Sequence, residues 1–272
     1  MVDNLPMFAI VSIARFALGS TTASACVFAL AAAANGVELS SIVSETAPEK
    51  SLTFTGLITV ESVTAFINGA GDGKYARIVV DSPGGNVADA IVLGNWIVDH
   101  ELDVEVKKNC ASSCANYLFA AGRRKIIDDG AVIVWHGSIG QKNFRERGER
   151  CDQLIRELER SSGDTLDKPR EDLANERAWC AWYPTMVAAE KAFFKRVGVD
   201  EYITRMGQEP HDFKAIWTVP VSVMNRMGLK NVEVRAAYAS HDDLMSWNRI
   251  DDPEPILSLG YDASGNVIEL VR

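Results

Sequence analysis

A serine at the start of a predicted helix is the residue of this chain best suited to nucleophilic chemistry. Residues 109–122 read Asn-Cys-Ala-Ser-Ser-Cys-Ala-Asn-Tyr-Leu-Phe-Ala-Ala-Gly, with Ser113 at their centre. Residues 103–107 predict a strand that leads into this turn, and a helix is expected to run from it to Gly122. Such a turn exposes a serine hydroxyl beside unpaired helix N–H groups, as acyl transfer requires. Alternatively, the small residues only allow the helix to pack closely.

Two further segments carry candidates for the same chemistry. Residues 76–81, Ala-Arg-Ile-Val-Val-Asp, predict a buried parallel strand, and the paired glycines of Ser-Pro-Gly-Gly-Asn at 82–86 follow it. Residues 131–136, Ala-Val-Ile-Val-Trp-His, predict another buried strand that ends in His136. Taken singly, the glycines fit an ordinary turn and the histidine fits a structural role. Because the carboxyl ends of parallel strands share one edge of a sheet, we expect the three segments to meet there.

These segments also match a known family in their order along the chain. The matching residues are Asp-Ser-Pro-Gly-Gly-Asn at 81–86, Ala-Ser-Ser-Cys-Ala at 111–115 with Ala-Gly at 121–122, and the strand that ends at His136. On these motifs the chain resembles the proteolytic subunit of the Clp protease. It resembles more closely the predicted periplasmic relatives of that subunit in the crotonase-like superfamily.

The resemblance implies a serine endopeptidase that cleaves peptides or unfolded segments without a cofactor or a metal ion. Ser113 would be the nucleophile and His136 the general base, and the backbone N–H groups of Gly85 and Cys114 would form the oxyanion hole. The implied fold is α/β, a spiral of ββα units with outer helices, and the implied assembly is a homo-oligomer. No Walker-type loop occurs in the sequence, so this chain itself would not use ATP.

The orienting acid of the site is where the resemblance weakens. Residues 216–234 resemble the closing segment of the family, with Trp217 as its aromatic residue, but Ala215 stands where the family has its aspartate. The nearest acid is Asp212, which is either the third member of the triad or a surface residue. A Ser–His pair without an orienting carboxylate is slower by orders of magnitude, though not necessarily inactive.

Two functions of other classes therefore stay open. An acyl-CoA-binding enzyme of the crotonase type would use the oxyanion hole on a thioester and would not need Ser113 together with His136. A catalytically impaired oligomeric scaffold would keep the fold without the acid, which agrees with Ala215. The joint presence of a serine and a histidine at strand ends favours the peptidase.

The composition and the first residues of the chain suggest an exported globular protein. The 272 residues are 47% hydrophobic and carry a formal net charge of −9, which argues against nucleic acid as a partner. Residues 1–35 combine Arg15, an apolar stretch and four alanines at 31–34, as in a signal peptide or an N-terminal membrane anchor. We therefore expect a periplasmic protein or one that faces the periplasm from the membrane, with the cytoplasm as the alternative.

The remaining chain is expected to hold one α/β domain and a tail. The domain spans residues 50–235 and includes a charged helical insertion at about 141–185, and the tail at 236–272 contains a predicted β-hairpin. Cys151 and Cys180 both fall in the insertion and are candidates for a disulfide. Cys110 and Cys114 flank Ser113, and either a disulfide or two buried thiols would fit them.

Overall fold

The computed structural model describes residues 50–161, 167–209, 216–234, 237–248 and 255–270. These residues belong to one unit of the chain, Thr46–Arg272. The predicted leader at 1–35 lies outside the described residues, as do Asp212 and Ala215. Within the described ranges, none of the helices has the length and apolar character needed to cross a membrane.

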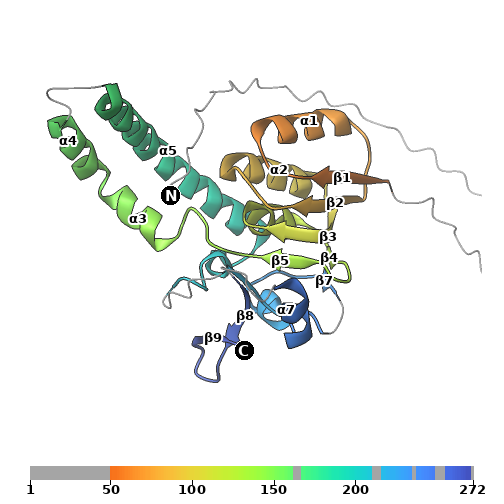
Figure 1. The fold of residues 1–272 in the computed structure, drawn as a ribbon. Coiled ribbons are helices and arrows are strands. Elements are labelled where there is room, and N and C mark those ends of the chain that lie inside the picture. The colour runs from red at the N-terminus through yellow and green to blue at the C-terminus, as the bar shows by residue number, and fades with distance from the viewer. Residues whose placement is uncertain (1–49, 162–166, 210–215, 235–236, 249–254, 271–272) are drawn as a thin grey trace, which may run out of the picture. The chain divides into compact units, whose positions relative to one another are not determined.

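A parallel sheet of six strands forms the centre of this unit (Figure 1). Five strands lie in the order β1-β2-β3-β4-β7, and β5 pairs with β3 beside that path. The strands are β1 (Ser51–Thr55), β2 (Arg77–Ser82), β3 (Asp103–Ala111), β4 (Lys125–Ile127), β5 (Val132–Val134) and β7 (Val232–Glu233). β-branched residues such as Ile78, Val80 and Val104 are fully buried, as expected in a parallel sheet. The predicted α/β class is confirmed, and so are the strands expected at 76–81, 103–107 and 131–136.

β3 changes its partner along its length. Its residues Val104, Glu105 and Val106 pair with β4, whereas Asn109, Cys110 and Ala111 pair with β5. On the other side, the register with β2 shifts between Val80 and Ser82. Such an irregularity bends a strand and changes its direction. The bend brings the end of β3 next to the end of β5. Trp135 and His136 directly follow β5 in the chain.

Helices α1 (Val60–Ala70) and α2 (Val87–Asp99) pack against each other beside the first strands (Figure 1). α1 begins in a capping box formed by Thr59 and Ser62. α2 begins directly after the glycine loop, where the Asn86 side chain accepts a hydrogen bond from the Asp89 N–H. The cap therefore fixes the end of the loop that carries Gly84 and Gly85.

The predicted helical insertion is a set of three helices that extends away from the sheet (Figure 1). They are α3 (Lys142–Glu149), α4 (Cys151–Ser161) and α5 (Asp167–Val197), and α5 contains Pro184. We call α3, α4 and residues 167–186 of α5 the helical arm. Trp179 stacks on Tyr183 within it, while the end of α5 packs on α2.

A second sheet of three strands follows in the last part of the chain. It contains β6 (Ile216–Thr218), β8 (Ile256–Tyr261) and β9 (Val267–Glu269). β8 and β9 pair antiparallel, in the part of the chain where the sequence predicts a hairpin. Trp217 of β6 forms a bridge with Trp135, which joins the two sheets next to His136. The short helices are η1 (Cys114–Phe119), η2 (Glu201–Thr204), α6 (Val221–Arg226) and α7 (His241–Trp247).

Candidate active site

At Ser112 the chain turns from the end of β3 toward the helix that follows. This serine has a φ of +57°, which is uncommon for a residue other than glycine. Its N–H donates to the Val134 carbonyl oxygen at 2.9 Å, and its own carbonyl oxygen accepts from the Asn116 N–H at 2.9 Å. The Ser112 backbone thereby ends the pairing with β5 and begins the helix in a single residue.

The side chain of Ser112 meets His136. A hydrogen bond of 2.6 Å joins Ser112 Oγ and His136 Nε2, and Ser112 is partly accessible to solvent while His136 is exposed. A hydroxyl within hydrogen-bond distance of an imidazole nitrogen is the arrangement of a serine nucleophile and its general base. The pair lies at the carboxyl ends of β3 and β5, where the sequence predicts the site.

Of the two adjacent serines, the structure places Ser112 against the histidine. Ser113, the expected nucleophile, is only 3% exposed, and its hydroxyl donates to the Gly85 carbonyl oxygen at 2.8 Å. The left-handed conformation at Ser112 presents that side chain to His136 and directs the next one inward. Ser113 therefore connects the serine turn to the glycine loop, and the expected Ser113–His136 pair is replaced by a Ser112–His136 pair.

The helix after the two serines is of the π type. Residues Cys114–Phe119 follow the i→i+5 pattern, so their turns are wider than those of an α-helix. All six residues of this π-helix are buried. The sequence carries no signal for it, because small and aromatic residues also suit an α-helix.

The glycine loop packs directly on the serine turn. A Cβ on Gly84 would lie 2.7 Å from the Ser112 Cβ, and one on Gly85 would lie 2.2 Å from the Ile58 carbonyl oxygen. The Gly84 carbonyl oxygen accepts from the Ile58 N–H at 2.9 Å. Since C=O and N–H point in opposite directions across a trans peptide, the Gly85 N–H points away from Ile58. We call residues 82–86, 110–114 and 135–140 together the serine edge.

Two amide side chains hold the backbone around His136. Gln208 Nε2 donates to the His136 carbonyl oxygen at 2.7 Å, and Asn116 Nδ2 donates to the Gly137 carbonyl oxygen at 3.0 Å. On the other side, Trp135 and Trp217 exchange two backbone hydrogen bonds of 2.8 Å each. The histidine is therefore exposed on a segment whose main chain is fixed on both sides.

A buried carboxylic acid, which the sequence analysis did not identify, lies behind the serine edge. Glu190 of α5 is 2% exposed, and its carboxylate accepts from the Tyr117 hydroxyl at 2.7 Å. Burial raises the pKa of Glu190 to about 7, although hydrogen bonds from Tyr117, Ser138 and the Gly140 backbone oppose this shift. Glu190 thus contacts the helix that follows Ser112 and also the segment that follows His136.

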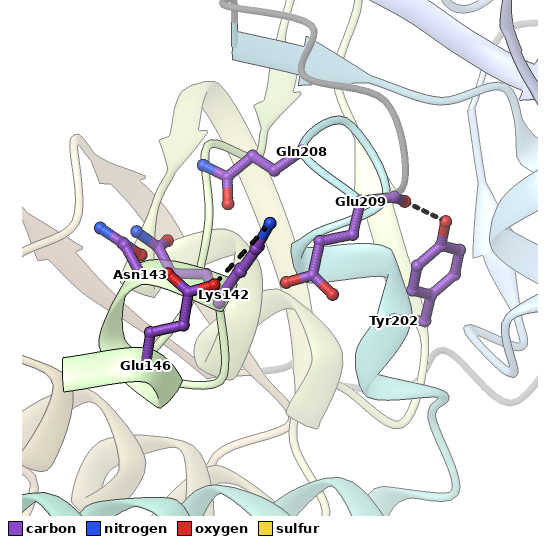
Figure 2. A pocket seen from close by; sticks show the side chains of 7 residues that line it. Lys142, Asn143, Glu146, Tyr202, Gln208 and Glu209 are labelled. Atoms are coloured by element: carbon purple, nitrogen blue, oxygen red, sulfur yellow. Dashed lines mark hydrogen bonds and ion pairs between the residues drawn. The ribbon is translucent and has the colours of Figure 1, made fainter. Parts of the chain in front are cut away.

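A cleft of about 880 Å³ opens beside the His136 segment. Its lining residues are polar or charged: Gln141, Lys142, Asn143, Glu146, Tyr202, Gln208 and Glu209. Lys142 and Glu146 form an ion pair of 3.7 Å, and the Tyr202 hydroxyl donates to the Glu209 carbonyl oxygen (Figure 2). Gln208 belongs to the cleft and also binds the His136 carbonyl oxygen, so the cleft borders the serine edge.

Glu209 contributes a fixed negative charge to this cleft. Its carboxylate receives two hydrogen bonds from the Arg145 guanidinium, at 2.8 and 3.1 Å. Burial raises the pKa of Glu209, but the hydrogen bonds and charge of Arg145, together with the charge of Arg205, outweigh it and keep the pKa below its ordinary value. Glu209 is therefore ionised and paired at neutral pH.

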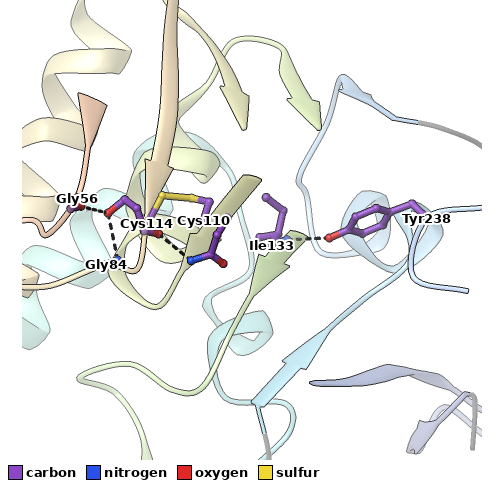
Figure 3. Close-up of a disulfide and its surroundings, with 8 residues drawn as sticks. Gly56, Gly84, Cys110, Cys114, Ile133 and Tyr238 are labelled. Carbon is purple, nitrogen blue, oxygen red and sulfur yellow. Dashed lines mark hydrogen bonds between the residues drawn. A yellow bond between two sulfur atoms is a disulfide. The ribbon is translucent and has the colours of Figure 1, made fainter. Parts of the chain in front are cut away.

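Two disulfides join cysteines within the described residues. One joins Cys151 to Cys180 in the helical arm, as considered from the sequence, and the other joins Cys110 to Cys114 across the serine turn (Figure 3). The two arm sulfurs and the Glu176 carboxylate lie within 4.8 Å of one another. Since thiolates rather than disulfide sulfurs bind metal ions, this group is not a metal site in its oxidised form.

The other predicted members of the site divide into two groups. Gly85 and Cys114 both lie in the serine edge, next to Ser112 and Ser113. Asp212 lies outside the described residues and stays a prediction. Comparison with known protein families and with curated proteins finds no match to this chain.

Proposed function

We propose that the chain is a serine hydrolase of the Clp-peptidase type, in which Ser112 is the nucleophile and His136 is the general base. The observation that carries the proposal is the 2.6 Å hydrogen bond between Ser112 Oγ and His136 Nε2 at the ends of two neighbouring parallel strands. The positive φ of Ser112 adds support, because nucleophilic serines often lie on sharp turns from a strand to a helix.

The reaction proposed for this pair is acyl transfer through a covalent intermediate. Ser112 Oγ attacks the carbonyl carbon of the scissile bond while His136 Nε2 takes the hydroxyl proton. His136 then gives that proton to the leaving amine as the carbon–nitrogen bond breaks. Water, activated by the same imidazole, releases the acyl group as a carboxylic acid and restores the Ser112 hydroxyl.

The negative charge on the substrate oxygen needs two N–H donors near Ser112. The Gly85 N–H is one candidate, since it points away from Ile58 and its residue is held by the Ser113 hydroxyl. The residue after the nucleophile supplies the second donor in many such sites, which here is Ser113. Cys114, predicted as this donor from the sequence, follows one position later at the start of the π-helix. Each well-placed donor contributes about 3 kcal/mol to the stability of the transition state.

The acid of the triad is part of the proposal. Asp212 follows Gln208 by four residues, and Gln208 itself binds the His136 carbonyl oxygen. A carboxylate on His136 Nδ1 would fix the tautomer that accepts a proton at Nε2. We assign this role to Asp212 as the nearest acid along the chain.

The lining of the cleft favours a peptide over an acyl-CoA thioester as the substrate. Its amides and charged groups offer donors and acceptors to a polypeptide backbone, whereas a fatty acyl chain requires an apolar pocket. The proposed substrates are therefore peptides or unfolded segments of proteins. Two disulfides agree with an oxidising compartment such as the periplasm. The bend of β3 and its two partners agree with a crotonase-like spiral, and a homo-oligomer belongs to the same proposal.

Hydrolysis assays with matched histidine variants test this function. Purified protein is offered unfolded casein, a set of quenched fluorogenic peptides and a short acyl-CoA. We expect peptide cleavage that falls by about three orders of magnitude in His136→Ala. Cleavage should remain unchanged in the control His241→Ala, which alters another histidine at the start of α7. Thioester cleavage without peptide cleavage, or equal rates in the two variants, would contradict the proposal.

A further inference from the structure

The Cys110–Cys114 disulfide closes a ring of five residues around Ser112 (Figure 3). Cys110 belongs to the end of β3 and Cys114 is the first residue of the π-helix, and their Cα atoms are 5.2 Å apart. Both cysteines are fully buried. Ser112 is the middle residue of this ring, so the disulfide spans the backbone on both sides of the proposed nucleophile.

The conformation of Ser112 is one that a serine does not favour by itself. A φ of +57° crowds the Cβ of an L-residue against its own backbone. Among the described residues, the interactions that hold it include the backbone hydrogen bonds with Val134 and Asn116, the side-chain hydrogen bond with His136, the contact with Gly84, and the ring itself. The disulfide fixes the distance between the two ends of the turn, and this limits the backbone angles open to the three residues between them.

The glycine loop is tied to the same ring. Asn109, one residue before Cys110, donates from its side chain to the Ser82 carbonyl oxygen, and the Ser82 hydroxyl accepts from the Gly84 N–H (Figure 3). Ser113, inside the ring, donates to Gly85. The ring therefore contacts both of the other parts of the serine edge: Ser113 binds the glycine loop, and Ser112 binds His136.

We infer that the Cys110–Cys114 disulfide positions Ser112 for attack, so that its reduction lowers the reactivity of Ser112 in a domain that stays folded. The inference rests on the proposed function. Reduction by a dithiol transfers two electrons and two protons to the two sulfurs, and the dithiol becomes a cyclic disulfide. The free turn then samples other backbone angles, and Ser112 Oγ spends less time at His136 Nε2.

A general stabilising role would predict a different pattern from a positioning role. In the chain-entropy model, a disulfide stabilises a fold more when it closes a longer loop, with a logarithmic dependence on length. The sequence separation is 29 for the arm disulfide and 4 for Cys110–Cys114. If stability alone mattered, loss of the arm disulfide would harm the activity more. A positioning role predicts the opposite order.

The test measures the rate at which a fluorophosphonate modifies Ser112. The proteins are wild type, Cys110→Ala/Cys114→Ala and the control Cys151→Ala/Cys180→Ala, all shown to be folded by near-UV circular dichroism. We expect the rate of modification to fall by about 10- to 100-fold in Cys110→Ala/Cys114→Ala, because a small misplacement of a reacting group has an effect of this size. Little change is expected in the control. A folded Cys110→Ala/Cys114→Ala protein that reacts at the wild-type rate would overturn the inference.

A redox titration of the wild-type protein supplies the measurement that does not depend on a variant. The protein is equilibrated in dithiothreitol buffers of graded potential, and alkylation with mass spectrometry reports the state of each cysteine pair. We expect the modification rate of Ser112 to follow the Cys110–Cys114 couple and not the Cys151–Cys180 couple. A Cys110–Cys114 bond that is reduced only when the domain unfolds would contradict a separate positioning role. If the oxidised wild type does not react at all, the proposed function fails, and this inference fails with it.

Discussion

The serine edge and the helical arm each contain one disulfide, but they are held together by different kinds of interaction. At the serine edge, many contacts involve backbone groups, and Gly84 and Gly85 leave no space for a Cβ. In the arm, charged side chains form pairs with one another, as Arg147 does with Glu176 and the more exposed Arg177 does with Glu159. The serine edge therefore holds its atoms in fixed positions, as a catalytic site requires. In the helical arm, the side chains can adjust their conformations.

This difference predicts how each region responds to substitution. Backbone contacts cannot relax without moving a strand, so changes at the serine edge should be costly and should alter reactivity. Exposed side-chain pairs contribute little to stability, so changes in the ion pairs of the arm should be mild, and changes anywhere in the arm should leave the reactivity of Ser112 unaffected. Four predictions test this contrast, beginning with the largest effect.

Two glycines with positive φ provide the first test. Gly85→Ala would place its Cβ 2.2 Å from the Ile58 carbonyl oxygen, and we expect a loss of about 4 kcal/mol in the free energy of unfolding from overlap and strain. Gly198 lies directly after α5. The Cβ of Gly198→Ala would have no described atom within 4 Å, so we expect a loss of only about 1 kcal/mol in the free energy of unfolding. Urea unfolding of both variants measures the difference. Equal losses would show that the glycine loop is not rigid.

The two disulfides provide the second test, now of stability instead of reactivity. Chain entropy predicts that loss of Cys151–Cys180 costs about 3.5 kcal/mol and loss of Cys110–Cys114 about 2 kcal/mol, before any change in packing. Equilibrium urea unfolding of the two double alanine variants gives these values. Loss of Cys151–Cys180 should therefore lower the stability more, whereas loss of Cys110–Cys114 should lower the reactivity of Ser112 more. A single order for both properties would mean that each disulfide acts only through stability.

Glu190 provides the third test, through pH. Its pKa is raised from 4.5 to about 7 in the folded protein, so the folded state binds more protons than the unfolded state between these values. The stability that it contributes is present below pH 4.5 and is lost as the pH rises through 7, by about 3 kcal/mol. Glu190→Gln, which resembles the protonated acid, should flatten the dependence of the unfolding free energy on pH over this range.

Glu209→Gln is the matched control for that pH dependence. The pKa of Glu209 is lowered in the folded state, so its contribution to stability is present at neutral pH and is lost as the pH falls through that lowered pKa. The two variants should therefore differ from the wild type at opposite ends of the pH range. Identical pH profiles for both variants would contradict the contrast between a buried acid and a paired one.

The smallest effect is expected in the arm. The Arg147 guanidinium forms two hydrogen bonds with Glu176 and lies 4.1 Å from the centre of the Trp179 ring. Arg147→Lys loses the paired geometry and should cost about 1 kcal/mol, whereas Arg177→Lys, at an exposed single contact, should cost almost nothing. Thermal unfolding measures both. Any fall in the reactivity of Ser112 in these variants would show that the arm and the serine edge are coupled.

The sequence predicted the frame of the site better than its inner geometry. Buried runs such as Ile78–Val80 and the end of β5 follow simple rules of burial, so the meeting of three strand ends was predictable. The choice between Ser112 and Ser113 was not, because it depends on one positive φ that the residue types do not reveal. Glu190 was also missed, since an acid inside an amphipathic helix has the same pattern whether it faces water or the core.

The most direct measurement of the central claim is the position of a fluorophosphonate adduct on the folded protein. The wild type, Ser112→Ala and Ser113→Ala are labelled under the same conditions, and peptide mapping locates the modified residue. Our account predicts an adduct on the Ser112 oxygen, no adduct in Ser112→Ala, and a retained adduct in Ser113→Ala. An adduct on Ser113, or labelling that survives in Ser112→Ala, would contradict it.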